Sequence, residues 1–253
     1  MTKEELQQLS DKIAYITINP KGGALKSAQI GLKNVGLEPK LLFYVKPTDR
    51  LRKEFKKYKL SFFHEFLIPK LKQINKSKKS VKVNNPDQVN IPIQKTITVS
   101  KLNSEETADQ IQKSGVKYLI NCGAGIFRNK IIRIPNLIIL NAHAGQLPDY
   151  KNMNVVEWAV CNGDDVVGTI HQIDNGIDTG PVWLEENIDI EGFESMEKVR
   201  EHAFDQVLRM FGKAIVQNEE GKIVPSHHDP KAGKKWYKMH SYYRNKVSRV
   251  LKE

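Results

Sequence analysis

The sequence contains little cysteine and no long apolar run. Its 253 residues include two cysteines, Cys122 and Cys161, which do not form a CxxC pair. A disulfide framework or a cysteine zinc site is therefore not expected, and both thiols are predicted to be buried. The opening residues MTKEELQQLSDK lack the apolar stretch of a secretory signal, and no window is apolar enough to span a bilayer. These absences predict a soluble cytoplasmic protein without a membrane partner.

Four familiar motifs are absent as well. The chain contains no GxSxG, GxxxxGKS/T, GxGxxG or HExxH pattern. These patterns mark the nucleophile of α/β hydrolases, phosphate-binding loops, dinucleotide-binding folds and zinc peptidases, respectively. Any catalytic chemistry must therefore come from a different set of residues.

The positive charge is concentrated in one segment. The formal net charge is +11, and residues 50–79 supply an excess of nine because they hold eleven Lys and Arg against two Glu. Large apolar residues recur there every three or four positions, which predicts an amphipathic helix: Leu51, Phe55, Tyr58, Phe62 and Phe66. This local excess favours a solvated helix face, or a wall that faces an anionic ligand, over a nucleic-acid-binding protein.

Strands and helices alternate along much of the remaining chain. Apolar runs predict strands at 13–18, 40–45, 95–100, 116–122, 136–141, 166–173 and 181–188. Helical patterns fall at about 25–34, at 103–115, at 154–163 and from Ser195 to about Gln217. In the helix at 103–115, Asn103 is the predicted N-cap, Glu106 takes the reciprocal capping position and Gly115 is the predicted C-cap. The tail at 234–252 places Trp236, Met239, Tyr243, Val247 and Val250 on one stripe, which predicts a docked helix.

This alternation predicts an α/β fold with a Rossmann-like, mostly parallel sheet flanked by helices. The expected core comprises residues 1–190, with a basic helical insertion at about 50–80. Residues 191–253 are expected to form a helical C-terminal extension packed on that core.

Polar residues stand where one buried strand should end. In LIILNAHAGQLPDY, Asn141 and His143 follow four apolar residues, and open parallel sheets place ligand sites beyond the carboxyl ends of their strands. If the backbone stays extended, both side chains project to the same face because side chains alternate along a strand. Further on, GTIHQIDNGIDTGPV contains His171 on a strand and Asp178 in a glycine-bounded loop.

Taken together, NAHAGQLPDY and GTIHQIDNGIDTGPV resemble the folate-dependent formyltransferase family. Its members include glycinamide ribonucleotide formyltransferase, methionyl-tRNA formyltransferase and the nucleotide-sugar N-formyltransferases. The shared pattern is Asn-x-His with a following Leu-Pro, then a Gly-x-Thr-x-His strand and an Asp-x-Gly loop. The similarity extends from about Leu119 to Ile188, and its separated elements agree in order and spacing.

The resemblance implies a role for each matching residue. Asn141 would donate its amide to the formyl oxygen, His143 would act as the acid or charge stabiliser, and Asp178 would hold the histidine or an ordered water. His171 would support the loop that carries Asp178. The pterin of 10-formyltetrahydrofolate, the implied co-substrate, would lie against Gly125, Ile126, Phe127, Ile173, Asp174 and Gly176, and no metal is implied.

The acceptor implied by the resemblance is a primary amine, and a nucleotide-linked amino sugar is the leading hypothesis. Lys151, Asn152 and Asn154 stand where the acceptor would approach, and they depart from the usual family pattern. About 35 residues follow the predicted long helix, fewer than the tRNA-binding domain of methionyl-tRNA formyltransferases needs. Glycinamide ribonucleotide and hydrolysis of the donor stay open as alternatives, and so does a homodimer.

Simpler interpretations exist for each residue taken alone. A strand-end Asn and a glycine-flanked Asp commonly form turns, and an isolated His is commonly structural. His143, His171, Asp174 and Asp178 can also be interpreted as a metal site, although their spacing matches no familiar metal motif. A nucleic-acid-binding module that uses the basic segment and the tail residues Tyr242, Tyr243 and Arg244 is the alternative from another functional class.

Overall fold

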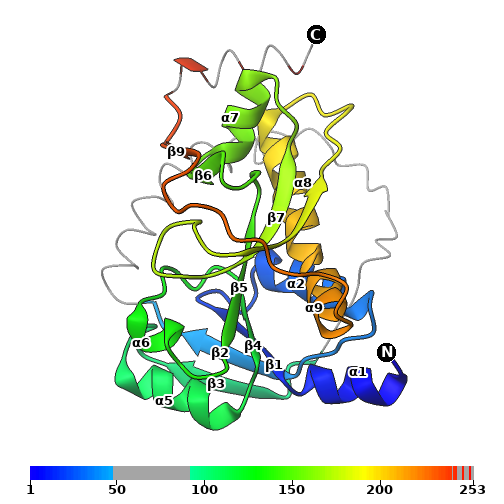
Figure 1. Cartoon of the computed structure of the whole chain (residues 1–253), viewed down its shortest axis with the longest axis vertical. Helices are drawn as coiled ribbons and strands as arrows, with labels where there is room; N and C mark the ends of the chain where they lie inside the picture. Colours follow the sequence, from blue (N-terminus) through cyan, green and yellow to red (C-terminus); the bar gives the residue numbers. More distant parts are fainter. Residues whose placement is uncertain (48–91, 241, 244–246, 248–250, 252–253) are drawn as a thin grey trace, which may run out of the picture.

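The computed structural model describes residues 1–47, 92–240, 242–243, 247 and 251 (Figure 1). The amphipathic helix predicted within 50–79, and with it the basic insertion at 50–80, lie outside these residues. Within the described part of the chain, no helix combines the length and the apolar character needed to cross a membrane.

The body of the protein is a seven-stranded sheet in the order β3-β2-β1-β4-β5-β7-β8. Its strands are β1 (Ile13–Thr17), β2 (Leu41–Val45), β3 (Lys95–Val99), β4 (Tyr118–Asn121), β5 (Ile138–His143), β7 (Val167–Gln172) and β8 (Val182–Asn187). The first five strands of the spatial order are mutually parallel, whereas β7 pairs antiparallel with both β5 and β8. The predicted mostly parallel sheet and its seven strands are therefore confirmed.

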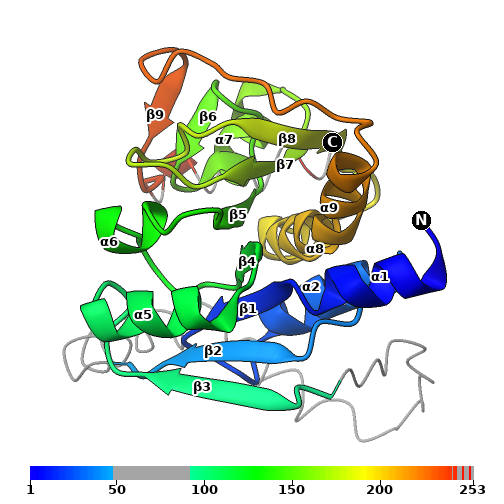
Figure 2. The same cartoon turned by 60° about the horizontal axis from the view of Figure 1, so that its bottom comes forward.

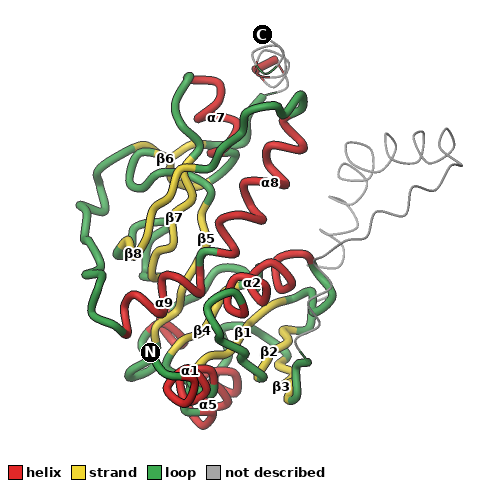
Figure 3. Tube along the Cα trace, turned by 90° about the vertical axis from the view of Figure 1, so that its right-hand side faces the viewer, coloured by secondary structure: helices red, strands yellow, loops and turns green. Residues whose placement is uncertain are grey.

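Helices cover both faces of this sheet. They are α1 (Lys3–Ser10), α2 (Gly23–Lys33), α5 (Glu105–Ser114), α6 (Asn129–Ile132), α7 (Val155–Asn162), α8 (Met196–Arg209) and α9 (Phe211–Glu219). Figure 2 shows α2, α8 and α9 lying together, and Figure 3 shows α8 running along β5 and β7. The division into a core of residues 1–190 and a separate extension stays a prediction.

The core divides in two because successive strand residues face opposite sides. All five residues of β1 are buried. Ile13 and Tyr15 pack with residues of α2, α8 and α9, whereas Ala14 and Ile16 pack with residues of α5 and α6. A strand buried on both faces reads as a continuous apolar run, and this accounts for the sequence IAYIT.

The helix at 103–115 begins one residue later than predicted. Ser104, not Asn103, is the N-cap, and its hydroxyl accepts from the Thr107 amide. Asn103 instead holds a loop, since its side chain donates to Ile126 O and accepts from Arg128 N. Glu106 does not close a capping box and contacts the Ser100 hydroxyl. Gly115 is the C-cap in the left-handed region, as predicted.

The single long helix predicted from Ser195 to Gln217 is wrong. Met210 separates α8 from α9. At this junction α2 crosses closely, because a Cβ added to Gly31 would collide with the backbone of Arg209, and one added to Gly212 with that of Gly31. A glycine on each side of the crossing therefore allows the backbones to touch, a tertiary constraint that helical periodicity does not reveal.

The C-terminal tail also begins differently from the predicted helix. Residues Lys234–Trp236 form β9, which pairs in parallel with β6 (Tyr150–Asn152) in a separate two-stranded sheet. Beyond it, Met239 and Val247 of the predicted stripe are buried against the body. The tail is thus tied to the chain segment that follows β5.

The glycine crossing gives a stability prediction. Gly31→Ala should lower the free energy of unfolding by about 2 to 3 kcal/mol, because the added methyl group has no space between the helices. Gly23→Ala on the same helix is the matched control: its added Cβ meets nothing within 4 Å, so the change should stay below about 1 kcal/mol. Urea unfolding measures the free energy of unfolding of both variants. Equal losses in the two would contradict a close contact between the helix backbones at Gly31.

Candidate active site

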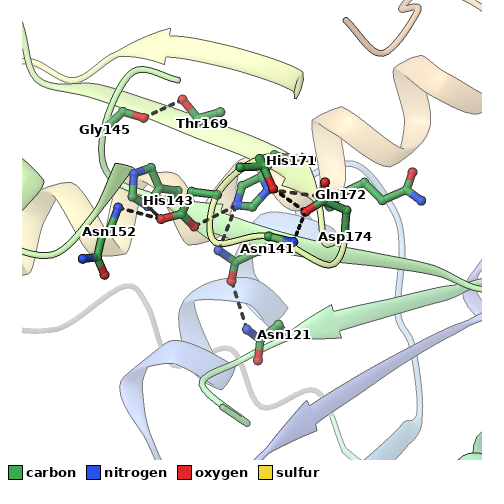
Figure 4. Close-up of polar contacts among 12 residues, drawn as sticks. Asn121, Asn141, His143, Gly145, Asn152, Thr169, His171, Gln172 and Asp174 are labelled. Carbon is green, nitrogen blue, oxygen red and sulfur yellow. Dashed lines mark hydrogen bonds and ion pairs between the residues drawn. The ribbon is translucent and has the colours of Figure 1, made fainter. Parts of the chain in front are cut away.

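Strand pairing brings the polar strand-end residues of the sheet together (Figure 4). Ile120 of β4 pairs with Leu140 of β5, so Asn121 and Asn141 follow at the same level. On the other side of β5, Asn141 pairs with His171 of β7. The strand β5 continues two residues beyond the predicted end at Asn141, to His143, which meets the condition for both side chains to project to one face. The three strands thereby gather side chains that are remote in sequence.

A cavity of about 330 Å³ opens at this place. Its lining includes the three predicted catalytic residues, the six predicted pterin-binding residues, His171 and Asn152, and also Ile177 from the loop at 174–178 that the resemblance assigns to the pterin. Two lining residues had not been suggested by the sequence: Asn121 and Phe204. Asn141, His143 and Asp178 thus converge on one cavity.

Asp178 occupies the centre of the cluster. Its carboxylate faces His143 Nδ1 at 3.7 Å and His171 Nε2 at 3.6 Å. The backbone N–H of Asn152 donates to Asp178 Oδ2 at 2.8 Å, which joins the end of β6 to the loop that carries Asp178. Asp178 and Asn152 both adopt left-handed backbone conformations, with φ of 55° and 84°. Asp and Asn tolerate this region better than most residues do, which fits their positions here.

The hydrogen-bond partner of His143 fixes its tautomer. His143 Nε2 lies 2.6 Å from the Tyr150 carbonyl oxygen, which can only accept, so Nε2 carries a hydrogen. In the neutral ring, Nδ1 therefore offers a lone pair toward Asp178. A proton taken up at Nδ1 would be stabilised by the facing carboxylate, an arrangement suited to acid-base chemistry.

His171 is held neutral. Its Nδ1 donates to the Gln172 carbonyl oxygen at 3.1 Å, so its Nε2 accepts from the Asn141 amide at 3.1 Å. Burial lowers the pKa of His171 to about 4, the neighbouring His143 acts in the same direction, and Asp178 opposes them. At neutral pH the contact between His171 and Asp178 is therefore not an ion pair.

Asn121 is a polar residue of the site that sequence analysis missed. Its Oδ1 accepts from the Ala124 amide at 2.9 Å, and its Nδ2 donates to Asn141 Oδ1 at 2.9 Å. The sequence did contain a signal for it, because Asn121 follows a run of buried residues in β4 just as Asn141 follows one in β5. The rule that identified Asn141 applied equally to β4.

Phe204 is the apolar residue that was missed. It extends from α8 into the cavity lining, and 43% of its surface is exposed. Ile126, which is 66% exposed, also lines the cavity. The pattern of α8 does not identify Phe204, because its exposure to the cavity depends on how the helix packs against β5 and β7.

Only one of the three predicted acceptor residues, Asn152, lines the cavity. Lys151 is buried, and its ammonium group donates to the carbonyl oxygens of Pro230 and Ala232. Asn154 donates to Glu157 Oε1 at 2.8 Å and accepts from Met239 N. The geometry therefore places Lys151 and Asn154 in contacts that hold the C-terminal segment.

The described residues contain no group of three or more His, Cys, Asp or Glu side chains arranged to hold a metal ion. Asp174, one of the four residues considered for such a site, has local partners instead. Its Oδ1 accepts from the Gly176 amide at 3.0 Å and from the Thr179 hydroxyl at 2.7 Å. These bonds shape the loop that leads to Asp178.

The chain belongs to the formyl transferase family. The family model matches residues 65–215, more than half of the chain, and this range contains every predicted site residue. This match confirms the resemblance noted in the sequence.

Individual relatives match shorter stretches. Methionyl-tRNA formyltransferase of Deinococcus radiodurans is 39% identical over 85 residues, which cover 33% of this chain and 27% of the relative. The enzyme of the same name from Prochlorococcus marinus is 32% identical over 104 residues, which cover 41% and 32% of the two chains. The chain thus spans about a third of the length of these relatives.

Solved structures agree on the fold. Glycinamide ribonucleotide transformylase 1 from Symbiobacterium toebii has a TM-score of 0.54 and 17% identity, with 86% of this chain and 92% of that chain covered. A sugar N-formyltransferase from a Shewanella species has a TM-score of 0.53 and 12% identity, with 94% and 87% covered. At these identities the likeness establishes the formyltransferase fold and not the substrate.

The buried His171 gives a pH prediction. Histidine in an unfolded chain has a pKa of about 6.5. Because the folded value is about 4, the unfolded chain binds more protons between these pH values. The contribution of His171 to the free energy of unfolding is therefore complete above pH 6.5 and falls as the pH drops toward 4, by at most about 1.4 kcal/mol per pH unit.

Urea unfolding between pH 7 and pH 4.5 measures this contribution. His171→Gln should show a shallower loss of stability with falling pH than the wild type does. His227→Gln, which changes an exposed histidine, is the matched control and should retain the wild-type slope. A wild-type slope in His171→Gln would show that His171 is not held neutral by the fold.

Proposed function

We propose that the protein transfers a formyl group from 10-formyltetrahydrofolate to a primary amine. The observation that carries the proposal is the convergence of Asn141, His143 and Asp178 on one cavity in a chain of the formyl transferase family.

The residues around the cavity fit a folate. Gly125, with φ of 114°, brings the backbone of 125–127 to the cavity edge, and Ile173 and Gly176 contribute the facing loop. Flat heterocycles with hydrogen-bonding edges bind well between apolar side chains and free backbone groups. Phe127 and Ile173 provide apolar surface, while the loop backbone provides polar partners for the pterin. The bound donor would supply an activated formyl carbon.

Asn141 is suited to stabilise the formyl oxygen. One hydrogen of its amide is used by His171 Nε2, and the other is left for a ligand. Negative charge develops on a carbonyl oxygen when an amine attacks its carbon, and a fixed donor stabilises that charge without reorganisation. In other enzymes the loss of one such donor costs about 3 to 4 kcal/mol of activation free energy.

His143 and Asp178 are suited to handle protons. Formyl transfer forms one bond from the formyl carbon to the amine nitrogen and breaks the bond to the folate nitrogen. The amine loses a proton, and the folate nitrogen gains one. His143 Nδ1 can hold the transferred proton beside Asp178, whose carboxylate stabilises the imidazolium at 3.7 Å. Proton transfer by a positioned side chain accelerates a reaction by about a hundredfold to ten-thousandfold.

The proposed acceptor is the amine of a nucleotide-linked amino sugar. The acceptor would approach the cavity beside Asn141, His143 and Asp178, where the donor's formyl group would lie. The half-exposed Phe204 offers an aromatic face, and such faces pack against the apolar side of a sugar or a base. Neighbours of the same fold include a sugar N-formyltransferase.

The amino group of a methionyl-tRNA is the second candidate acceptor. The supporting observation is the sequence identity of 39% with a methionyl-tRNA formyltransferase over 85 residues. Glycinamide ribonucleotide is a third candidate, and hydrolysis of the donor would result if no amine is admitted.

Substitutions at the cavity test the catalytic roles. Asn141→Ala should lower kcat about 100-fold to 1000-fold because the formyl oxygen loses its donor. Asp178→Asn retains an acceptor for the Asn152 amide and tolerates the left-handed backbone, yet removes the charge, and should lower kcat about 100-fold. Steady-state rates of formyl transfer from 10-formyltetrahydrofolate to an accepted amine give kcat.

The exposed Asn187→Ala is the matched control for these variants, and it should leave kcat unchanged. Circular dichroism should show a native fold in each protein. If Asp178→Asn kept near-normal activity, the proposed role of the Asp178 carboxylate in proton transfer would be wrong.

An acceptor panel tests the substrate class. We expect turnover with at least one dTDP-, UDP- or GDP-linked amino sugar, at a kcat/KM about 100-fold or more above that for glycinamide ribonucleotide or methionyl-tRNA. A 100-fold ratio of kcat/KM is expected when the site forms hydrogen bonds that only the preferred acceptor can make. Turnover confined to methionyl-tRNA or to the ribonucleotide would overturn the sugar hypothesis, and donor hydrolysis without any acceptor would indicate a hydrolase.

A further inference from the structure

A chain of hydrogen bonds runs through the site from one backbone group to another. The Ala124 amide donates to Asn121, Asn121 donates to Asn141, Asn141 donates to His171, and His171 donates to the Gln172 carbonyl. The three distances that join Ala124, Asn121, Asn141 and His171 lie between 2.9 and 3.1 Å. Figure 4 shows Asn121, Asn141, His171 and Gln172 in this order.

The two ends of the chain fix its direction. A backbone N–H can only donate, so Ala124 requires the oxygen of Asn121, and this leaves the Asn121 nitrogen as a donor. At the other end a carbonyl oxygen can only accept, so His171 carries its hydrogen on Nδ1 and accepts at Nε2. Asn141 lies between a donor and an acceptor, and only one of its two amide orientations satisfies both.

We propose that Asn121 is a positioning residue that sets the orientation of the Asn141 amide. The inference rests on the proposed function, in which Asn141 donates to the formyl oxygen. An amide turned by 180° has nearly the same shape but exchanges its oxygen and its nitrogen. In that orientation Asn141 would present a lone pair to the formyl oxygen and repel the charge it must stabilise.

Asn121 performs this task because of its position in the fold. It stands at the end of β4, one level with Asn141, and its bond to Ala124 begins the loop that contains Gly125. A residue with only a structural role in that loop would need the bond to Ala124 alone. The second bond, from Nδ2 to Asn141, is the feature that assigns a positioning role.

Asn121→Asp separates these two functions. The new carboxyl group has the shape of the amide and can still accept from Ala124 in either protonation state. When ionised it has no hydrogen for Asn141, whereas when protonated its O–H donates to Asn141 Oδ1 as the amide does. Position 121 is half-buried, and partial removal from water raises the pKa of a carboxyl group, so protonation should occur within the accessible pH range.

The expected result is a loss that acid reverses. At pH 8, Asn121→Asp should lower kcat about 100-fold, the effect of losing one donor to the formyl oxygen, with the donor KM changed by less than about threefold. The ratio of its kcat to that of the wild type should rise at least about tenfold between pH 8 and pH 5.5, as the new carboxyl group is protonated. Using the ratio removes the pH dependence of the wild type.

Asn121→Ala is the matched control. It keeps the titratable groups around Asn141, namely His143, His171, Asp174 and Asp178, but introduces no new carboxyl group. The kcat of Asn121→Ala should fall about tenfold, because Asn141 keeps only the bond to His171. The ratio of this kcat to the wild-type kcat should not change with pH. This variant also tests the proposal if Asn121→Asp does not fold.

Three outcomes would overturn the role of Asn121. They are a wild-type kcat for Asn121→Ala, a wild-type kcat for Asn121→Asp at pH 8, and a ratio for Asn121→Asp that does not rise as the pH falls. Each requires a wild-type protein that transfers formyl groups, so the proposed function stands in these cases. A wild-type protein without transferase or hydrolase activity would instead overturn both proposals.

Discussion

The pairing of β5 with its two neighbours is the constraint on which the site depends. Parallel pairing with β4 brings Asn121 level with Asn141, and antiparallel pairing with β7 places His171 on the other side. A shift of register by one residue would turn these side chains to the opposite face of the sheet. The two buried cores on the faces of the sheet oppose such a shift, because it would also expose their apolar residues. The geometry of the candidate site and the hydrophobic packing are therefore maintained by the same interaction.

Within this frame the polar groups have little freedom. Backbone atoms fix the hydrogen positions of both imidazoles: the Tyr150 carbonyl does so for His143, and the Gln172 carbonyl does so for His171. The two rings consequently differ in role although their centroids are 6.2 Å apart. His171 is buried and neutral, and it orients an amide. His143 faces a carboxylate and has a nitrogen available for a proton.

Much of the fold followed from the sequence because it depends on local patterns. Strands buried on both faces leave apolar runs, and a left-handed C-cap needs glycine, so the seven strands of the main sheet and Gly115 were predicted correctly. The break at Met210 and the strand β9 depend on partners that are distant in sequence, namely α2 and β6. Asn141, His143 and Asp178 were identified by a joint motif, whereas Phe204 required the packing of α8 to be known. Lys151 was misjudged because a lysine beside a site looks like a substrate contact unless its burial is known.

The placement of Lys151 connects the C-terminal segment to the chemistry. The strand β6 carries the Tyr150 carbonyl that orients His143 and the Asn152 amide that holds Asp178. Lys151, between them, points the other way and binds the carbonyl oxygens of Pro230 and Ala232, next to β9. Gly233 brings this segment so close to Pro148 that a Cβ there would collide with the Pro148 carbonyl. The backbone of β6 serves the site through Tyr150 and Asn152, and the Lys151 side chain between them is anchored by the C-terminal segment. The C-terminal segment therefore supports the candidate site, and none of its described residues belongs to the cavity lining.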